Sequence, residues 1–318
     1  MLRRNFLIAA SILTAVSTGI PAALAQETYP DKPVEFIVPW APGGGSDTLM
    51  RLVAGGLEEE LGQPVPVINV PGVSGTLGLA QVTEAEPDGY TISQIHDGLL
   101  TAYHTALTDL NWDSFTPVGL ITSSPQFVVV HADSPWKTFE EFVAAAKEEP
   151  GSIKFGVTLA GVPHLHAAMI EDATGAEFSY VGYEGTGERI RGALGGTVDA
   201  VIGDVASAGQ FVENGDLRFL AVGSEERLSE FPDVPTLTEL GYDLNLSVNR
   251  GIVVPKDTPE ERVAVLEEAL SKIAADEEFV KQIKNAGGDV VFRDHEAYTQ
   301  SLQKLDETVE RLSSMLAP

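Results

Sequence analysis

The amino-acid sequence predicts an α/β fold in which parallel sheets carry helices on both faces. Three observations support this prediction. Short β-rich runs alternate with amphipathic helical stretches along most of the chain, and a hydrophobic content of 43% is ample for packed cores. No internal repeat, low-complexity tract or flexible linker interrupts the pattern. Any boundary between two lobes is therefore expected to be a hinge of strands that cross from one lobe to the other.

The elements follow one another in a regular order. A strand at 34–38 is followed by a helix at 47–61, in which apolar residues recur every three or four positions and form one buried stripe. That stripe consists of Leu49, Leu52, Val53, Leu57 and Leu61. The next expected elements are a strand at 65–70, a helix at 77–85 and a strand at 90–93. Later strands are expected at 127–130, 154–157, 180–181, 200–202, 217–222 and 252–254, with helices at 138–149, 164–174 and 187–194. Residues 259–316 are expected to be mostly helical.

Residues 1–25 predict a signal peptide. Arg3 and Arg4 precede an apolar run at 6–16 that is too short to span a bilayer, and Ala23-Leu24-Ala25 is a small-x-small cleavage pattern. Arg3-Arg4-Asn5-Phe6-Leu7 also looks like a twin-arginine export signature, although any signal needs positive charge, so the export route stays open. No later segment is apolar enough for a membrane helix, so we expect an exported chain without direct membrane insertion.

The mature chain is strongly acidic. Removal of residues 1–25 takes away two arginines and no acids, so the formal net charge falls from −27 to −29. This charge argues against nucleic acid and anionic lipid as partners. An anionic ligand would need local donors, such as helix N-termini, loop amides or an arginine. A saline habitat, where screening shortens the field, is a further interpretation. The absence of cysteine excludes disulfides, thiolate catalysis and cysteine-ligated zinc.

Four small-residue loops each lie between an expected strand and an expected helix. They are residues 39–47, 71–76, 158–164 and 183–187. In the first loop, three glycines let the backbone approach a ligand, and Ser46 or Asp47 can cap the following helix. Such loops lie at the carboxyl ends of strands, where open α/β sheets bind ligands. The loop is neither a Walker loop, because no lysine follows the glycines, nor a GxGxxG fingerprint. Each loop taken alone is also compatible with a plain turn.

These loops carry a resemblance to a known family. Tyr29-Pro30-Asp31-Lys32-Pro33-Val34, followed by Pro39-Trp40-Ala41-Pro42-Gly43-Gly44-Gly45-Ser46-Asp47, closely resembles the opening of the Bug receptors. Those receptors are the substrate-binding proteins of tripartite tricarboxylate transporters, the TctC family. Further matching motifs occur in order along almost the whole mature chain. They include Gly62-Gln63-Pro64-Val65, Pro71-Gly72 with Gly75, Pro87-Asp88-Gly89-Tyr90-Thr91, His164-Leu165, residues 194–199, residues 231–237, and Val254-Pro255 with Thr258-Pro259.

The resemblance implies a two-lobe periplasmic-binding-protein fold of the Venus flytrap type, similar to type II, with a ligand cleft between the lobes. Lobe 1 would comprise 26–127 plus 246–318, and lobe 2 would comprise 128–245. It also implies a non-enzymatic periplasmic receptor for a small carboxylate-bearing metabolite, a di- or tricarboxylate or another organic acid. The receptor would act as a monomer, without metal or cofactor, and deliver its ligand to membrane transporter subunits.

In this family a carboxylate is gripped mainly by loop amides, hydroxyls and bound waters. Carried over by position, the expected ligand-binding residues of lobe 1 are Trp40, Gly43, Gly44, Ser46, Asp47, Ser74, Gly75 and His96. Those of lobe 2 are Thr158, Ala160, Gly161, His164, Gly185, Thr186 and Asp204. His96 stands near where many members have serine or glycine, and Arg250 where many carry an aromatic pair. Arg250 could fork onto a second carboxylate at the hinge, and a salt bridge with a nearby acid is the alternative.

Other chemistries are less well supported. His164 and His166 are two apart and would point to different helix faces, which disfavours a metal pair. No G-x-S-x-G elbow supports a hydrolase. Asp204 fits a hydrogen-bond acceptor better than a catalytic acid. Two alternatives are kept: a periplasmic enzyme that processes a carboxylate, which would turn the ligand over, and a ligand sensor for a signalling receptor, whose deletion would leave uptake intact.

Overall fold

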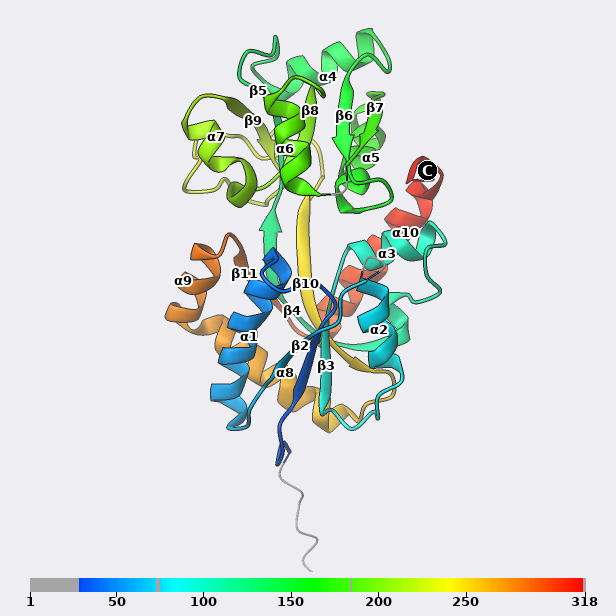
Figure 1. Ribbon diagram of the computed structural model, residues 1–318, viewed down its shortest axis with the longest axis vertical. Helices are drawn as coiled ribbons and strands as arrows, with labels where there is room; N and C mark the ends of the chain where they lie inside the picture. Colours follow the sequence, from blue (N-terminus) through cyan, green and yellow to red (C-terminus); the bar gives the residue numbers. More distant parts are fainter. Residues whose placement is uncertain (1–28, 73–74, 184, 317–318) are drawn as a thin grey trace, which may run out of the picture.

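The computed structural model describes residues 29–72, 75–183 and 185–316; the predicted signal peptide and Ser74 lie outside the described residues. The chain forms two α/β lobes joined by long strands (Figure 1). One lobe is built on a six-stranded sheet and the other on a five-stranded sheet. The predicted two-lobe α/β class is confirmed. No helix within the described ranges is long and apolar enough to cross a membrane.

The six-stranded sheet has the order β11-β4-β10-β3-β1-β2. Its strands are β1 (Glu35–Val38), β2 (Val67–Asn69), β3 (Thr91–His96), β4 (Phe115–Pro125), β10 (Ser247–Pro255) and β11 (Asp289–Arg293). β1 runs parallel to β2 and β3, whereas β4 runs antiparallel to β10 and β11, and β10 antiparallel to β3. The expectation of parallel strands is therefore wrong for β4, β10 and β11. β4 leads into the second lobe and β10 leads back, so the two strands run in opposite directions.

The five-stranded sheet has the order β7-β6-β8-β5-β9. Its strands are β5 (Phe127–His131), β6 (Lys154–Val157), β7 (Ser179–Gly182), β8 (Ala200–Gly203) and β9 (Leu217–Val222). β6 is parallel to β7 and β8, and β5 is antiparallel to β8 and β9. This sheet is also mixed. Its strands come from 127–222, while those of the first sheet come from 35–125 and 247–293. The lobe boundaries given above stay a prediction.

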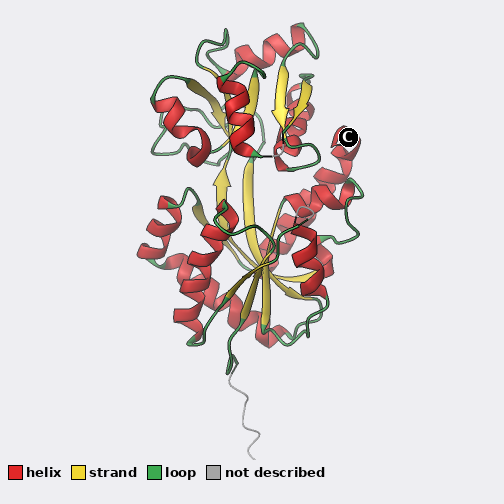
Figure 2. Ribbon diagram, in the orientation of Figure 1, coloured by secondary structure: helices red, strands yellow, loops and turns green. Residues whose placement is uncertain are grey.

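Helices cover both sheets (Figure 2). In the first lobe they are α1 (Gly45–Leu61), α2 (Thr76–Thr83), α3 (Gly98–His104), α8 (Glu260–Ala275), α9 (Glu277–Asn285) and α10 (His295–Leu316), with a 3₁₀ turn η2 (Trp112–Ser114). In the second lobe they are α4 (Phe139–Glu148), α5 (Val162–Thr174), α6 (Thr186–Leu194) and α7 (Gln210–Glu213), with a π-helical turn η3 (Val205–Gly209). Consecutive residues of β1 supply both core layers of the first lobe, because Phe36 packs in the cluster of α1 and α8 and Ile37 in that of α3 and α10.

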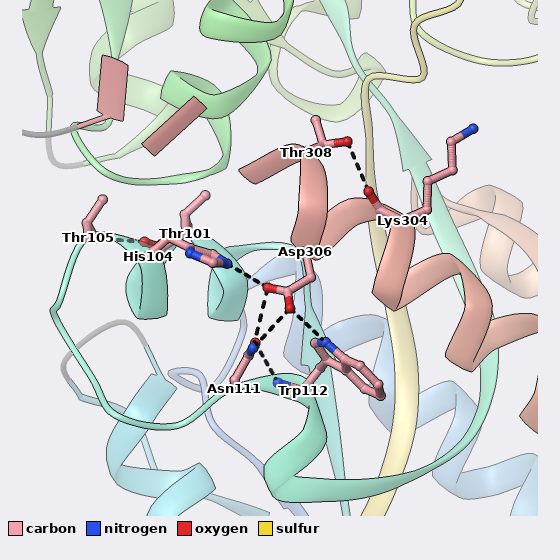
Figure 3. A network of polar contacts seen from close by, with 8 residues as sticks. All are labelled: Thr101, His104, Thr105, Asn111, Trp112, Lys304, Asp306 and Thr308. Carbon is pink, nitrogen blue, oxygen red and sulfur yellow. Dashed lines mark hydrogen bonds and ion pairs between the residues drawn. The ribbon is translucent and has the colours of Figure 1, made fainter. Parts of the chain in front are cut away.

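Helix α10 contacts both lobes. Its Asp306 carboxylate contacts His104 Nε2 at 2.6 Å and accepts hydrogen bonds from Asn111 Nδ2 at 3.2 Å and Trp112 Nε1 at 3.2 Å (Figure 3). These contacts hold α10 against the first lobe. Further along the helix, Arg311 pairs with Asp172 of α5 at 2.6 Å. The helix therefore packs on elements of both lobes.

Candidate ligand-binding site

Four helices begin at the small-residue loops, and each has a glycine at its N-cap. The caps are Gly44 for α1, Gly75 for α2, Gly161 for α5 and Gly185 for α6, and none makes a side-chain capping hydrogen bond. By contrast, α4 and α9 are capped by the side chains of Thr138 and Asp276. Because glycine has no side chain, the cap residue itself supplies no acceptor to the first turn of these helices, and a helix N-terminus of this kind can bind an anion.

Asp47 shapes the first loop from within. Its Oδ2 accepts from the Gly43 amide at 2.8 Å, and its Oδ1 accepts from Asn69 Nδ2 at 2.8 Å and lies 3.0 Å from Arg51 Nη2. Burial alone would raise the pKa of Asp47, but these donors hold it below its usual range. The expectation that Ser46 or Asp47 occupies the cap position is wrong, because α1 begins earlier, at Gly45. Asp47 is fully engaged with protein donors and holds the loop in place.

Two stacked aromatic rings lie beside this loop. The Trp40 and His96 rings stack with centroids 4.5 Å apart. Gly75 has φ +89°, and a Cβ there would lie 3.1 Å from the Trp40 ring, so this position requires glycine. Loss of hydration and the Arg250 guanidinium lower the pKa of His96 to about 3, and its Nδ1 accepts from the Gly98 amide. His96 is therefore neutral and contributes no cation. Trp40 Nε1 is buried and has no hydrogen-bond partner among the described residues.

Arg250 lies on β10 in the hinge and is 7% exposed. Its Nε donates to Ser46 Oγ at 3.0 Å, and its Nη1 donates to Ser124 Oγ at 2.9 Å and to the Val248 carbonyl at 3.1 Å. Within the described residues no carboxylate lies within 4.0 Å of it, so the structure shows no salt bridge of the kind considered above. Burial lowers the pKa of Arg250 to about 10, so the group stays charged.

In the second lobe, two of the small-residue loops are linked by a buried arginine that was not among the predicted site residues. Arg189 of α6 is 3% exposed; its Nη1 donates to Thr158 Oγ1 at 2.7 Å and its Nη2 to Thr186 Oγ1 at 3.1 Å. One signal was present in the sequence: Arg189 shares a helix face with Gly192 and Ala193, three and four residues later, and both of these are buried. A cation on that apolar face predicts a buried guanidinium. The predicted site residues Thr158 and Thr186 therefore both accept hydrogen bonds from Arg189.

The loop before α5 is strained at a predicted site residue. Ala160 has φ +55°, an uncommon conformation for a residue with a side chain, and its amide donates to His164 Nδ1 at 3.2 Å. His164 packs edge-on against Tyr180, and its Nε2 is buried without a partner among the described residues. Asp204 caps η3 by accepting from the Ser207 amide at 2.8 Å. The loop that precedes α5 is thus fixed by contacts within the second lobe.

A cleft of about 880 Å³ lies on the other face of the hinge strands. Asn249 lines it, whereas the next residue, Arg250, points to the opposite face and bonds to α1, because side chains alternate along a strand. None of the ligand-binding residues expected from the sequence lines this cleft. Its charged lining includes the Arg311–Asp172 pair and Arg293, 3.9 Å from Glu225. The cleft is therefore separate from the candidate site.

Asp97, beside Asn249, predicts a pH-dependent stability. Burial raises the pKa of Asp97 to about 7, although Asn249 and Arg250 act in the opposite direction. The unfolded pKa is about 3.9. Between about pH 4 and pH 7 the folded form therefore keeps a proton that the unfolded form has lost, and stability falls as pH rises through this window. Asp97→Asn should remove this loss, which is at most about 4 kcal/mol.

Thermal unfolding of wild type and Asp97→Asn should show a higher Tm for the variant at about pH 8 and equal values at about pH 3.5. Tyr298, the neighbouring phenol, has a pKa raised well above its ordinary value and stays neutral throughout. Equal Tm values at about pH 8 would show that Asp97 is not held protonated by its surroundings.

Two α/β lobes joined by crossing strands, with glycine-capped helices beginning at the loops of both lobes, define a two-lobe solute-binding protein. The chain belongs to the tripartite tricarboxylate transporter receptor family, whose model matches residues 49–316. The predicted resemblance is confirmed. Members of this family are substrate-binding proteins and not enzymes.

Individual relatives agree with the family assignment. The chain is 31% identical to the protein BugT of Bordetella pertussis, over 84% of this chain and 85% of that protein. A TctC solute-binding protein from Polaromonas has a TM-score of 0.80 and 34% identity, covering 90% of this chain and 99% of that one. MatC from Rhodopseudomonas palustris, solved with bound malate, has a TM-score of 0.70 and 26% identity, covering 91% and 100% of the two chains.

Proposed function

We propose that this protein is a periplasmic receptor that captures a small organic acid and delivers it to the membrane subunits of a tripartite tricarboxylate-type transporter. The observation that carries the proposal is the set of glycine-capped helices. The N-termini of these helices are candidate local donors for a carboxylate, and an acidic chain that binds an anion requires such donors. The malate bound by MatC is an acid of the proposed class.

The expected ligand-binding residues stay part of this proposal. Lobe 1 would supply the Ser46 hydroxyl and amides at the start of α1, and lobe 2 would supply amides at the starts of α5 and α6. The amides of Gly43 and Gly161 themselves donate to Asp47 and Thr158 and hold the turns in shape. The buried Arg250 adds a cation, and among the described residues no carboxylate lies within 4.0 Å of it, although the charges of Asp97 and Asp204 act on it from further away. Transporter coupling is supported by family membership.

Three measurements test the function. Mass spectrometry of ligand released from gently purified protein should detect an organic acid, and calorimetric titration with malate and related acids should show saturable binding to one site. A deletion strain should lose uptake of the acid so identified. Release of a chemically changed ligand would favour an enzyme, and normal uptake in the deletion strain would favour a sensor.

Ligand binding is expected to make the molecule more compact. If the acid contacts loops on both lobes, it binds the closed form better than the open form and shifts the equilibrium towards closure. Small-angle X-ray scattering with and without the confirmed ligand should show a smaller radius of gyration in its presence. An unchanged radius would mean that the ligand contacts one lobe only, or that the ligand-free protein is already closed.

A further inference from the structure

The cleft on the other face of the hinge strands is large enough for a small molecule and has apolar walls. Its volume of about 880 Å³ lies in the range of small-molecule sites. Leu165 and Met169 of α5 line it from the second lobe, and Leu302 and Leu305 of α10 line it from the first. Leu165 and Leu302 are buried, whereas Met169 and Leu305 are partly exposed. An apolar group in the cleft would therefore be covered from both lobes.

Two polar side chains are anchored along β10 in this cleft. Ser247 and Asn249 both line it, and they are two residues apart on one face of the strand, which places them about 7 Å from each other. Asp97 Oδ2 accepts from the Asn249 amide at 3.1 Å and from Asn249 Nδ2 at 3.3 Å. The His166 ring is hydrogen-bonded to the backbone of Ser247. Asp97 and His166, which also line the cleft, are therefore held at neighbouring positions.

Both of these side chains offer hydrogen-bond acceptors. His166 is 2% exposed, and loss of hydration lowers its pKa to about 3, so the ring is neutral. The contact with Ser247 acts to raise that pKa, so it is made by a ring N–H. The buried His166 Nδ1, which has no partner among the described residues, is therefore a bare acceptor. Asp97 is 5% exposed, and burial raises its pKa to about 7, so its carboxylate is charged above neutral pH.

The cations near the cleft do not pair with Asp97. Among the described residues no cationic side chain lies within 4.0 Å of its carboxylate. Arg293 and Arg311 are engaged with acids of the second lobe, at 3.9 Å and 2.6 Å, and Lys304 is exposed. Arg250 acts on Asp97 electrostatically, but it bonds to α1 on the other face of β10. A buried carboxylate without a counter-ion is costly, and a cation that reaches it reduces that cost.

We propose that this cleft binds a small organic cation, a primary amine with an apolar body, whose ammonium group donates to the Asp97 carboxylate and to His166 Nδ1. An ammonium group carries three donors and no acceptor, which matches two acceptors at neighbouring positions. The apolar body would pack between α5 and α10. An anion would face these acceptors without a donor, and a bare metal ion would leave the apolar walls unused.

The charge of the whole molecule favours the same class of ligand. The chain has a formal net charge of −27, which attracts cations. The cleft is separate from the residues expected to bind the organic acid, since none of them lines it. This inference therefore goes beyond the proposed function and does not rest on it.

The test compares ligands of equal length that differ in charge. Hexylamine and 1-hexanol are titrated by calorimetry at pH 8 into wild type, Asp97→Asn and Glu307→Gln. Glu307 is exposed on α10 and lies outside the lining of the cleft, so its replacement is a matched loss of one acid. Wild type and Glu307→Gln should bind hexylamine at one site and prefer it to 1-hexanol by at least about tenfold. Asp97→Asn should lose this preference, while its affinity for 1-hexanol stays within about twofold of wild type.

A shorter amine tests the apolar walls. Ethylamine should bind to wild type at least about tenfold more weakly than hexylamine, because it is four methylene groups shorter. Met169→Lys keeps Asp97 and places an ammonium group of the chain itself in the cleft, from a partly exposed position. This variant should not bind hexylamine, and it replaces Asp97→Asn in the test if that variant does not fold.

Five results would overturn the inference. They are equal affinities of wild type for hexylamine and 1-hexanol, equal affinities for hexylamine and ethylamine, and an unchanged hexylamine affinity in Asp97→Asn or in Met169→Lys. The fifth is an equal loss in Asp97→Asn and Glu307→Gln, which would show only a general attraction of the amine to an acidic surface.

Discussion

Replacing Arg250 with alanine is expected to weaken binding of a dicarboxylate by about 2–5 kcal/mol, because a desolvated charge pair would lose one partner. Binding of a monocarboxylate should hardly change, since the loop donors that hold its one carboxylate remain. Calorimetry with succinate and butyrate, at low and high salt, measures both effects. The chain has a formal net charge of −27 that repels anions, so any binding held by amides alone should stay level or strengthen modestly as salt screens the repulsion.

A matched control variant keeps the Arg250 charge and removes one of the hydrogen bonds that hold its guanidinium. Ser124→Ala deletes the 2.9 Å hydrogen bond to Arg250 Nη1 but leaves the bonds to Ser46 and Val248. The loss of dicarboxylate affinity in this variant should be much smaller than in Arg250→Ala. Thermal unfolding of both variants establishes that they are folded. Equal dicarboxylate affinity in wild type and Arg250→Ala would remove Arg250 from the site.

Gly44→Val is expected to abolish most binding while the fold survives, at a cost of about 1.5–3 kcal/mol per charge-assisted hydrogen bond lost. Gly44 has φ −78°, which valine tolerates, and a Cβ there would meet only the Ala41 carbonyl oxygen, at 3.4 Å. The new side chain would therefore extend over the first-turn amides of α1 and keep a carboxylate away from them.

Gly55→Val is the matched control on the same helix. Gly55 is exposed, and a Cβ there meets no atom within 4 Å, so the same residue is introduced away from the loop. The affinity of this variant for a confirmed acid should equal that of wild type. Unaltered affinity in Gly44→Val would instead show that the first loop is only a turn.

The local pattern of apolar and polar residues was enough to locate most helices and strands. The strand predicted at 217–222 and that at 154–157 have the observed bounds, and the helix predicted at 47–61 differs only at its start. Their periodicity is set by residues close in sequence, and burial of one face selects the matching element. The family, too, followed from ordered motifs in the chain.

Two strands that were not predicted, β4 and β11, pair with strands far away in the sequence, and the short helices α3 and α7 were also not predicted. In β4 the run of residues is buried on both faces and contains Pro117, Pro125 and a serine pair, so neither alternation nor an apolar run identifies it. Its long pairing with β10, which is more than a hundred residues away, makes it a strand. The antiparallel pairing of β4 and β10 has the same cause, because the direction of β10 is decided by where the chain re-enters the first lobe.

The sequence by itself determined the α/β class, the family and the small-residue loops that precede four helices, since these depend on local propensity and on motifs in order. Tertiary structure alone decided how the donors are combined. It brought Arg250 to Ser46, 204 positions earlier, and Arg189 to Thr158, 31 positions earlier. Among the described residues it placed no carboxylate within 4.0 Å of either buried guanidinium. Whether a charge is paired depends on which acids the packed chain brings within a few ångströms, and spacing along the sequence does not contain that information.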